Sequence, residues 1–344
     1  MKILVTGAAG FIGFHVVNHL LKNGNEVVGI DNISDNKDLE IKHARLSLLG
    51  INVEALYQSD AEQKGHNGLR FLRLDILNRE ALGALCRTEN FDIIVHLAAL
   101  TGTTMANLKP AQFYDTNVTG TLNLLELARR NGVQHFFYSS SSVVYSTQAK
   151  APFEEEDHVD TPLNMYAASK RSAELLCYTY AKSYGLPVTV FRLFAVYGPW
   201  ARPDSVPMQL ADRMMKGRNI RLLNEGQIVR DFTYIDDLLE GMSAALSSQP
   251  YGSNSVPYAL YNVGRGKPVS LLAFIQAMEF ALGRSAEVQI VPDSVLHSGE
   301  LVEMYADTSK LERELAYSPV WDYEEALPRF AAWFKEHYGH SFHM

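Results

Sequence analysis

The sequence predicts an α/β fold, with a doubly wound parallel sheet followed by a smaller mixed α/β C-terminal domain. Two observations predict this fold class. Short β-branched and aliphatic segments alternate with amphipathic segments of helical period from residue 2 to residue 194, as in parallel sheets covered by helices on both faces. Beyond the segment Tyr197-Gly198-Pro199-Trp200 the alternation loosens and the elements become shorter, which indicates a second unit.

The first elements form one strand–helix–strand unit. Residues 2–6 are predicted to be a buried strand, residues 11–21 an amphipathic helix that stops at Asn23-Gly24, and residues 26–31 a second strand that ends on an acid. The unit is complete in about thirty residues, which is the length typical of a βαβ motif.

The alternation then continues in the same order. Further strands are predicted at 69–75, 91–98, 134–139 and 187–194, and further helices at 79–86, about 113–131 and about 165–184. A helix over 208–216 is expected early in the second unit. The polar segment 33–68, rich in Asn and Asp, is expected to be the least structured insertion.

Composition excludes several classes of protein. The 344-residue chain is 47% apolar and carries a formal charge of −8, which opposes capture of a nucleic acid or an anionic membrane as its main activity. Its two cysteines, Cys86 and Cys177, form neither a disulfide framework nor a zinc-type pair. Its apolar runs stay below the ~18 residues of a membrane-spanning helix. We therefore expect a cytoplasmic globular protein with no metal site.

The glycine turn after the first strand carries the first chemical signal. Gly7, Gly10 and Gly13 lie between a predicted strand and a predicted helix, where glycines allow a tight turn, close approach of a pyrophosphate and close helix packing. Asp31 ends the second strand, where an acid accepts hydrogen bonds from the adenosine ribose hydroxyls, and no arginine follows it directly to receive a 2′-phosphate. The pattern therefore indicates a dinucleotide site that takes NAD rather than NADP.

The second signal is the segment Tyr166-Ala167-Ala168-Ser169-Lys170. Tyr166 and Lys170 are four residues apart and so share one helical face, and a serine run, 139–142, precedes them at a strand end. A phenol titrates at about 10 in water, and a nearby ammonium together with a positive nicotinamide ring would lower that value. This constellation predicts that Tyr166 acts as a base.

Together these motifs resemble those of the extended short-chain dehydrogenases/reductases, and within that family those of the UDP-glucuronate 4-epimerases. The resemblance rests on TGAAGFIGFH (6–15), VVGIDN (27–32), HLAA (96–99), the serine strand end, YAASK (166–170), VYGPWARPD (196–204), VRDFTYIDD (229–237) and YADTSKLERELAYSP (305–319). It implies an NAD-binding Rossmann domain over 1–194, with 228–262 returning to it, and a sugar-nucleotide substrate domain over 195–227 and 263–344.

The resemblance also implies roles for individual residues. Those that would hold NAD are Gly7, Gly10, Phe11, Ile12, Gly13, Asp31, Asn32, Asp75, Ile76, Leu97, Ala98, Ala99 and Asn117, with Tyr166 and Lys170 at its nicotinamide ribose. Those that would bind the UDP-sugar are Ser141, Ser142, Thr103, Arg202, Asp204 and Arg230, with Arg202 at the sugar carboxylate. A homodimer that pairs through the long helices near 113–131 and 165–184 is implied as well.

The implied reaction is inversion at carbon 4 of a UDP-sugar, here the interconversion of UDP-glucuronate and UDP-galacturonate for polysaccharide biosynthesis. In such epimerases Tyr166 would take the proton of the 4-hydroxyl while hydride passes to tightly bound NAD, and the transient 4-keto sugar would turn over before the hydride returns. Ser141 would hydrogen-bond the reacting oxygen, and Lys170 would keep Tyr166 acidic.

Several alternatives stay open. Dehydration and decarboxylation of the same 4-keto sugar need a further acid/base pair, which Val143 cannot supply. Val143, Ala195 and the loop at Thr103–Thr104 replace hydroxyl or arginine side chains common among UDP-glucuronate epimerases. The alternative is therefore a UDP-glucose/UDP-galactose or UDP-N-acetylhexosamine 4-epimerase. An NAD-dependent sugar-nucleotide reductase or dehydrogenase, and a dinucleotide-sensing protein, are the more distant alternatives.

Overall fold

The computed structural model describes residues 1–34, 38–58, 62–222, 226, 228–248, 250, 256–291 and 301–338. They divide into two compact units. The first unit comprises Met1–Tyr145, Val159–Arg192 and Met242–Tyr261, and the second comprises Ser146–His158, Leu193–Gly241 and Asn262–Met344. Of the range 228–262, the part from Met242 to Tyr261 thus lies with the first unit and the part up to Gly241 with the second.

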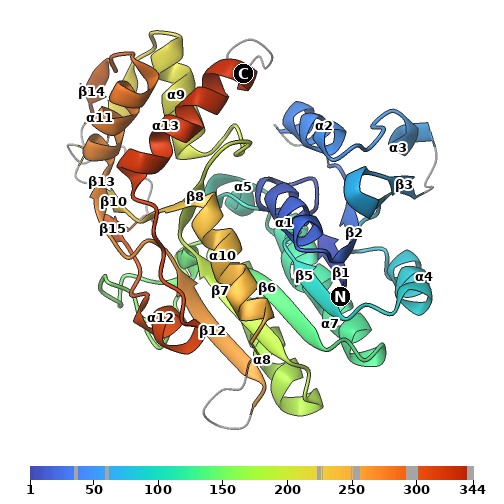
Figure 1. Ribbon diagram of the computed structural model, residues 1–344. Helices are drawn as coiled ribbons and strands as arrows, with labels where there is room; N and C mark the ends of the chain where they lie inside the picture. The colour runs from blue at the N-terminus through green and yellow to red at the C-terminus, as the bar shows by residue number, and fades with distance from the viewer. Residues whose placement is uncertain are drawn as a thin grey trace. The chain divides into compact units, whose positions relative to one another are not determined.

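An eight-stranded sheet forms the centre of the first unit (Figure 1). Its strands in spatial order are β12 (Tyr258–Val263), β7 (Val188–Leu193), β6 (His135–Ser141), β5 (Ile93–His96), β1 (Lys2–Thr6), β2 (Glu26–Asp31), β4 (Arg70–Arg73) and β3 (Gln63–Lys64). From β6 through β4 neighbouring strands pair in parallel, while the edge strand β3 pairs antiparallel with β4. The chain leaves β1 toward β2 on one side and returns to β5 on the other. This reversal marks the switch point at which open α/β sheets bind ligands.

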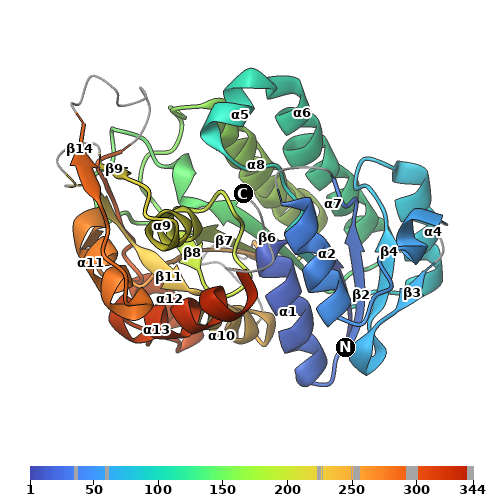
Figure 2. The same ribbon diagram turned by 90° about the horizontal axis from the view of Figure 1, so that it is seen from above.

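Helices cover both faces of this sheet. They are α1 (Phe11–Lys22), α2 (Leu39–Leu48), α3 (Ala55–Gln58), α4 (Arg79–Glu89), α5 (Thr103–Leu108), α6 (Pro110–Tyr114), α7 (Gly120–Arg130) and α8 (Met165–Tyr184). Figures 1 and 2 show α1 on one face and α7 and α8 on the other. The core on the α7–α8 side joins Leu4 and Val28 of the sheet to Leu82, Leu124 and Cys177 of the helices. The predicted doubly wound α/β fold is confirmed.

Two sequence-based expectations were wrong in detail. The segment 33–68 is not the least structured part, because it contains α2, α3 and β3. Its polar composition concealed a packed helix: in α2 not only Ile41 and Leu46 but also Lys42 and Arg45 are buried. The single helix expected over 113–131 is divided, because a π-helical turn, Asp115–Thr119, separates α6 from α7. Such turns often mark functional sites.

The second unit is a mixed α/β structure built from short elements. Its strands are β8 (Ala195–Tyr197), β9 (Ile220–Leu222), β10 (Val229–Arg230), β11 (Phe232–Tyr234), β13 (Val269–Ser270), β14 (Val288–Ile290) and β15 (Glu303–Met304). They form the small sheets β13-β10-β15, β11-β8 and β14-β9. Its helices are α9 (Val206–Met215), α11 (Leu271–Leu282), α12 (Ser309–Leu315) and α13 (Tyr323–Trp333), and α10 (Ile235–Leu246) leads back toward the first unit.

A buried carboxylate organises the second unit around its motif strands. Asp231, fully buried between β10 and β11, accepts hydrogen bonds from the main-chain N–H groups of Arg265, Gly266 and Ala306 at 2.6, 2.9 and 3.1 Å. Burial raises the pKa of Asp231 to about 6, although these N–H groups oppose the shift. The ring of the next residue, Phe232, stacks on that of Phe274 with centroids 3.8 Å apart. One acid therefore fixes two other chain segments, at 265–266 and at Ala306, to its own strand connection.

Across the residues that the structure describes, we find no helix long and apolar enough to cross a membrane. Within the same residues, His, Cys, Asp and Glu side chains form no group of three or more that could hold a metal ion.

Candidate active site

The glycine turn between β1 and α1 leaves no room for side chains. Gly7 has a φ of +71°, and a Cβ there would lie 2.8 Å from the main-chain nitrogen of Ala98. A Cβ on Gly13 would lie 2.0 Å from the carbonyl oxygen of Gly7, and the N–H of Gly10 donates to that same oxygen at 2.9 Å. The three glycines thus bring the start of α1 directly against the turn, where any larger residue would collide with backbone.

The start of α1 fits the phosphates of a dinucleotide. Its N-cap, Gly10, has no side chain to satisfy the first N–H groups of the helix, so these donors and the positive end of the helix dipole stay available for an anion. Phe11 and Ile12 open this helix and bring two of the donors. A bare glycine turn and an uncapped helix start are the features that a pyrophosphate requires, and the residues fit NAD.

Asp31 lies at the carboxyl end of β2 and is itself fixed in place. Its carboxylate accepts from the main-chain N–H groups of Ala9 at 3.2 Å and Ile33 at 2.8 Å. The buried ammonium of Lys42 lies 3.9 Å from Asp31 and 3.4 Å from the carbonyl and hydroxyl oxygens of Ser34. A cation thus stands beside the acid expected at the ribose.

Lys42 and its helix neighbour Arg45 were missed by the sequence analysis. The guanidinium of Arg45, fully buried, donates to the carbonyl of Ala9 at 2.9 Å and so supports the glycine turn from behind. The helical spacing of the sequence could have indicated their burial, because both cations lie on the face of 39–48 that also carries Ile41 and Leu46. The polar composition of the segment concealed that face.

The end of β4 carries Asp75 and Ile76. Asn32 donates its side-chain amide to Asp75 at 2.9 Å, and the N–H of Leu77 donates to the same carboxylate at 2.8 Å. Ile76 is buried against Gly120, where a Cβ would lie 2.4 Å from the Ile76 side chain. The expected cofactor residues Asn32, Asp75 and Ile76 are therefore brought together at one place.

A buried hydrogen-bond chain joins β1, β5 and α7 through His96. Thr121 donates its only hydroxyl hydrogen to the carbonyl of Asn117 at 2.6 Å, so His96 Nε2, 3.0 Å away, must donate to Thr121. Burial lowers the pKa of His96 to about 3, so the ring is neutral and its Nδ1 accepts from Thr6 at 2.8 Å. Thr6 in turn accepts from the N–H of Ala98 at 3.1 Å. His96 therefore holds the 97–99 segment against the glycine turn.

Asn117, in the π-helical turn, closes the same region. Its amide accepts from the N–H of Leu100 at 2.8 Å and donates to the Leu100 carbonyl at 2.9 Å and to the hydroxyl of Ser169 at 3.0 Å. The side chain is buried and fixes the loop after Ala99 to helix α8. The structure thus gives Asn117 a clear part in shaping this loop.

Tyr166 and Lys170 lie in the first turns of α8, where Asn164 caps the helix by accepting from the N–H of Ala167 at 2.9 Å. Lys170 is buried and donates from Nζ to the carbonyl of Ser139 at 2.7 Å, with the ring of Tyr138 at 5.0 Å. Burial lowers the pKa of Lys170 to about 8. The helix face that carries the expected base is thus tied to the end of β6.

The segment after β6 contributes to the surroundings of Tyr166. Ser141 ends β6, and its hydroxyl accepts from the N–H of Val143 at 3.4 Å, while Ser142 is buried. Val143 packs against the small cluster formed by Tyr166, Phe113 and Ala106. Tyr166 is 8% exposed, with its ring edge-on to Phe113 at 6.2 Å. The side chain next to the expected base is therefore apolar.

The other expected substrate residues lie apart along the chain. Thr103 opens α5 in the first unit after Gly102, whose φ is +105°. In the second unit, Arg202 makes a two-pronged contact with Asp204, at 2.9 Å from Nε and 2.8 Å from Nη2. Arg230 in β10 donates to the carbonyls of Val229 and Val302.

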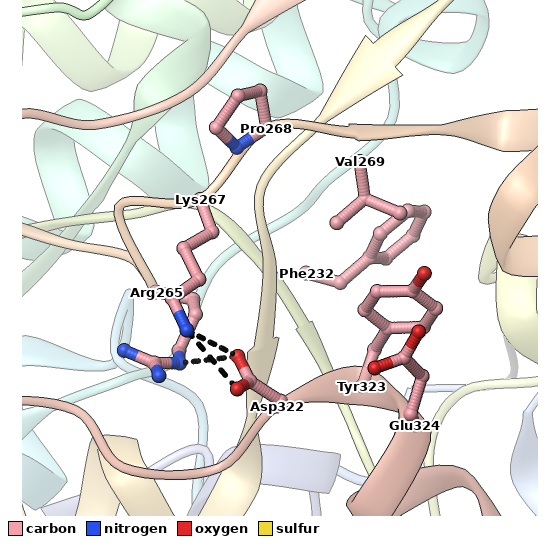
Figure 3. A pocket seen from close by; sticks show the side chains of 8 residues that line it. All are labelled: Phe232, Arg265, Lys267, Pro268, Val269, Asp322, Tyr323 and Glu324. Carbon is pink, nitrogen blue, oxygen red and sulfur yellow. Dashed lines mark hydrogen bonds and ion pairs between the residues drawn. The ribbon is translucent and has the colours of Figure 1, made fainter.

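The second unit also contains a cavity of about 220 Å³ (Figure 3). Its lining residues are Phe232, Arg265, Lys267, Pro268, Val269, Asp322, Tyr323 and Glu324. Asp322 pairs with both cations, Arg265 at 3.1 Å and Lys267 at 2.9 Å. Ligand pockets usually exceed about 300 Å³, and the expected site residues do not line this one. We therefore place the candidate active site in the first unit, at the carboxyl ends of the parallel strands.

The comparisons with known proteins agree with this geometry. The model of the NAD-dependent epimerase/dehydratase family matches residues 3–264. The chain belongs to this family. It is 38% identical over 334 residues to a protein of Thermodesulfobacterium geofontis (strain OPF15) named UDP-glucuronate 4-epimerase, covering 97% of this chain and 96% of that one.

Two solved epimerase structures of the family resemble the chain closely. A UDP-glucuronic acid 4-epimerase of Bacillus cereus, in complex with UDP-glucuronic acid and NAD, is 33% identical with a TM-score of 0.84, covering 98% of this chain and 100% of that one. A UDP-glucose 4-epimerase of Thermotoga maritima, with UDP-glucose, is 28% identical with a TM-score of 0.83, covering 98% and 99%. The two solved structures therefore match this chain over 98% of its length.

Proposed function

We propose that the protein is an NAD-dependent UDP-sugar 4-epimerase that interconverts UDP-glucuronate and UDP-galacturonate through a transient 4-keto sugar. The observation that carries this proposal is the hydrogen bond from Lys170 on α8 to Ser139 on β6. It brings Lys170, Tyr166 and Ser141 to the carboxyl ends of the strands, where the glycine turn also lies. Relatives that are named UDP-glucuronate 4-epimerases support the choice of substrate.

NAD would be held by the residues that gather at the carboxyl ends of the parallel strands. They are Gly7, Gly10, Phe11, Ile12 and Gly13 after β1, Asp31 and Asn32 after β2, Asp75 and Ile76 after β4, Leu97, Ala98 and Ala99 after β5, and Asn117, Tyr166 and Lys170 on the helices. When bound, NAD supplies the oxidising chemistry, since its nicotinamide accepts a hydride and can give it back.

The chain itself moves the proton of the reaction. Tyr166 would accept the proton of the sugar 4-hydroxyl at its phenolate oxygen and later return it, and the apolar cluster around its ring would hold that oxygen in place. Ser141 would orient the reacting oxygen from the strand end. Lys170, with one of its three N–H groups committed to Ser139, would stabilise the phenolate and orient the ribose.

Val143 argues against the rival reactions of the family. Dehydration or decarboxylation of a 4-keto sugar needs an acid/base group beside the ring, whereas here Val143 packs against the Tyr166 cluster. A valine there offers no proton. Val143 beside Tyr166 therefore favours epimerisation over dehydration and decarboxylation.

Arg202 is the proposed partner of the sugar carboxylate. An oxidised glucuronate is a β-keto acid that loses carbon dioxide once its carboxylate aligns with the ketone, so a two-pronged arginine contact would also hold it out of alignment. Asp204 already occupies the Nε–Nη2 edge of Arg202, so a substrate carboxylate would have to displace it from that edge. This competition is the observation that favours a neutral UDP-sugar, such as UDP-glucose, as the second candidate.

Removing the Arg202 guanidinium tests this role. We expect Arg202→Ala to lower kcat/KM for UDP-glucuronate by about tenfold to a hundredfold, the loss of a charge-assisted pair, and to release a UDP-pentose by-product. Turnover of UDP-glucose should change little. Full glucuronate turnover by Arg202→Ala with no pentose would contradict the assignment.

The first experiment is to incubate the purified protein, without added nucleotide, with UDP-glucuronate, UDP-glucose or UDP-N-acetylglucosamine in separate reactions. The products are resolved by chromatography and NMR. Formation of UDP-galacturonate supports the main proposal, whereas turnover of a neutral sugar alone supports the second candidate. A requirement for added NAD in each cycle, with net reduction, would instead indicate a dehydrogenase.

We also propose that the enzyme is a homodimer in the cytoplasm and that its product serves polysaccharide biosynthesis. Leu175 and Tyr178, on the outer face of α8, are 51% and 40% exposed, so the helix presents apolar surface suited to a second copy. Cys86 and Cys177 are buried free thiols, as is typical of a reducing compartment.

A further inference from the structure

Glu174 is a buried carboxylate that the proposed reaction does not use. It lies one helical turn after Lys170 on α8 and is 1% exposed. It accepts from the hydroxyl of Ser140 at 2.6 Å, from Arg192 at 3.0 Å (Nε) and 2.9 Å (Nη2), and from Arg171 at 3.2 Å. A buried charge is retained only where geometry is good and its partners are complete, and here four donors surround one carboxylate.

The Ser140 contact connects Glu174 to the active-site strand end. Ser140 stands between Ser139, whose carbonyl accepts from Lys170, and Ser141, which would contact the substrate. Tyr138 and Ser140 point to the same face of β6, since side chains alternate along a strand. On that face Tyr138 lies under Lys170 and Ser140 under Glu174. Two adjacent turns of α8 are thus fastened to adjacent residues of β6.

Glu174 also compensates the charge of Lys170. Burial lowers the pKa of Lys170 to about 8, and the carboxylate of Glu174 opposes that shift. The other groups that face Lys170 are the buried thiol of Cys177 on α8, the phenol of Tyr138 on β6 and the neutral ring of His96 on β5. Burial raises the pKa values of Tyr138 and Cys177 well above their usual range, so these two groups stay neutral.

We propose that Glu174 is a positioning residue for the epimerase reaction, which fixes the end of β6 through Ser140 and keeps Lys170 charged. The effect on turnover rests on the proposed function, whereas the effect on the charge of Lys170 does not. The Ser140 hydrogen bond and the negative charge of Glu174 can therefore be removed separately, and each loss should change a different measured quantity. Ser140→Ala removes the mechanical tie and keeps the charge, and Glu174→Gln keeps an acceptor for Ser140 and removes the charge.

The test measures Lys170 directly by NMR titration of 13C-labelled lysines in the NAD-loaded protein, without sugar, with Lys170→Arg to assign the signal. In Glu174→Gln we expect the Lys170 midpoint to fall by about one pH unit or more, since an opposite charge nearby raises a lysine pKa by that amount. The alkaline limb of kcat should move down with it. In Ser140→Ala the midpoint should stay, while kcat falls about tenfold or more from misplacement of Ser141.

A double variant distinguishes this role from the alternative that Glu174 only neutralises the buried guanidinium of Arg192. Glu174→Gln leaves the Arg192 guanidinium buried without its partner, which can destabilise the fold by itself. In Glu174→Gln/Arg192→Met the pair is gone, so we expect the melting temperature to recover while the Lys170 midpoint and kcat stay low. Recovery of all three would overturn the proposal.

Glu126→Gln is the matched control. Glu126 on α7 also accepts from two arginines and from the Tyr180 hydroxyl, at 2.6 Å, but away from the proposed site. It should leave the Lys170 midpoint and kcat unchanged. The proposal fails if Glu174→Gln and Ser140→Ala fold and keep both values of the wild type. If the wild type turns over none of the UDP-sugars, the proposed function fails, and the Lys170 titration still decides the charge role.

Discussion

At the scale of single residues, the hydroxyl of Tyr166 is the group on which the proposed chemistry depends. Its ring is fixed by Phe113 and by the rest of its apolar cluster, so Tyr166→Phe should keep the fold and the bound NAD. We expect kcat to fall by about 10²- to 10⁴-fold, the usual contribution of a general acid–base group. Turnover and NAD content after denaturation measure the two effects. Tyr178→Phe, on the exposed face of the same helix, should change neither, and equal losses in both variants would contradict the role.

His96 gives a second prediction at this scale. The pKa of His96 is lowered to about 3 in the folded state, against about 6.5 unfolded. Between these values the unfolded chain binds the extra proton, so the free energy of unfolding falls as the pH falls from 6.5 toward 3, by up to ~1.4 kcal/mol per pH unit. His96→Gln should be less stable at neutral pH, with a shallower acid slope.

Urea denaturation at several pH values checks the slope of His96→Gln. The exposed His158 supplies the control, because His158→Gln should leave the slope as in the wild type. In 15N NMR spectra His96 should show the neutral ring with hydrogen on Nε2 down to pH 5. A protonated ring at pH 5 would refute the hydrogen-bond assignment.

At the scale of elements, the junction of β1 and α1 depends on a missing Cβ. The Cβ of Gly13→Ala would lie 2.0 Å from backbone oxygen, so α1 must shift away from the turn, at a cost of at least about 1–3 kcal/mol and with loss of bound NAD. Gly83→Ala in α4 is the matched control, since its Cβ would meet only the flexible end of Arg87 at 3.4 Å. It should stabilise the fold by about 0.5–1 kcal/mol. Thermal unfolding and the NAD content of the purified variants measure the two effects. Retained NAD in Gly13→Ala would contradict the proposed binding of the NAD pyrophosphate at this turn.

At the scale of the whole molecule, the proposed dimer predicts which apolar surface is covered. Leu175→Glu on α8 should convert the protein to a monomer, because a charge cannot be buried unpaired at an interface. Phe280→Glu on α11 is the comparison, since Phe280 is 89% exposed and lies in the second unit. Sedimentation velocity distinguishes the two. A dimer that survives Leu175→Glu and dissociates with Phe280→Glu would move the interface to α11.

Much of the first unit followed from short-range pattern. The alternation of apolar strands with amphipathic helices predicted β1, α1, β2 and α8 closely, because period and turn chemistry are local properties of the chain. The spacing of Gly7, Gly10 and Gly13, and of Tyr166 and Lys170, indicated the chemistry for the same reason. The ends of β4, β5 and α4 differed from the expected ends by a few residues, since tertiary contacts decide where an element stops.

What sequence by itself determined is therefore the order of elements, the dinucleotide turn and the residue types of the site. Only the tertiary structure decided that Lys42 stands beside Asp31 and that Ser140 donates a hydrogen bond to Glu174. These contacts are governed by burial and by hydrogen bonds between residues far apart in the chain or on different elements. A buried charge looks the same as an exposed one in a sequence, and only packing shows which partners complete it.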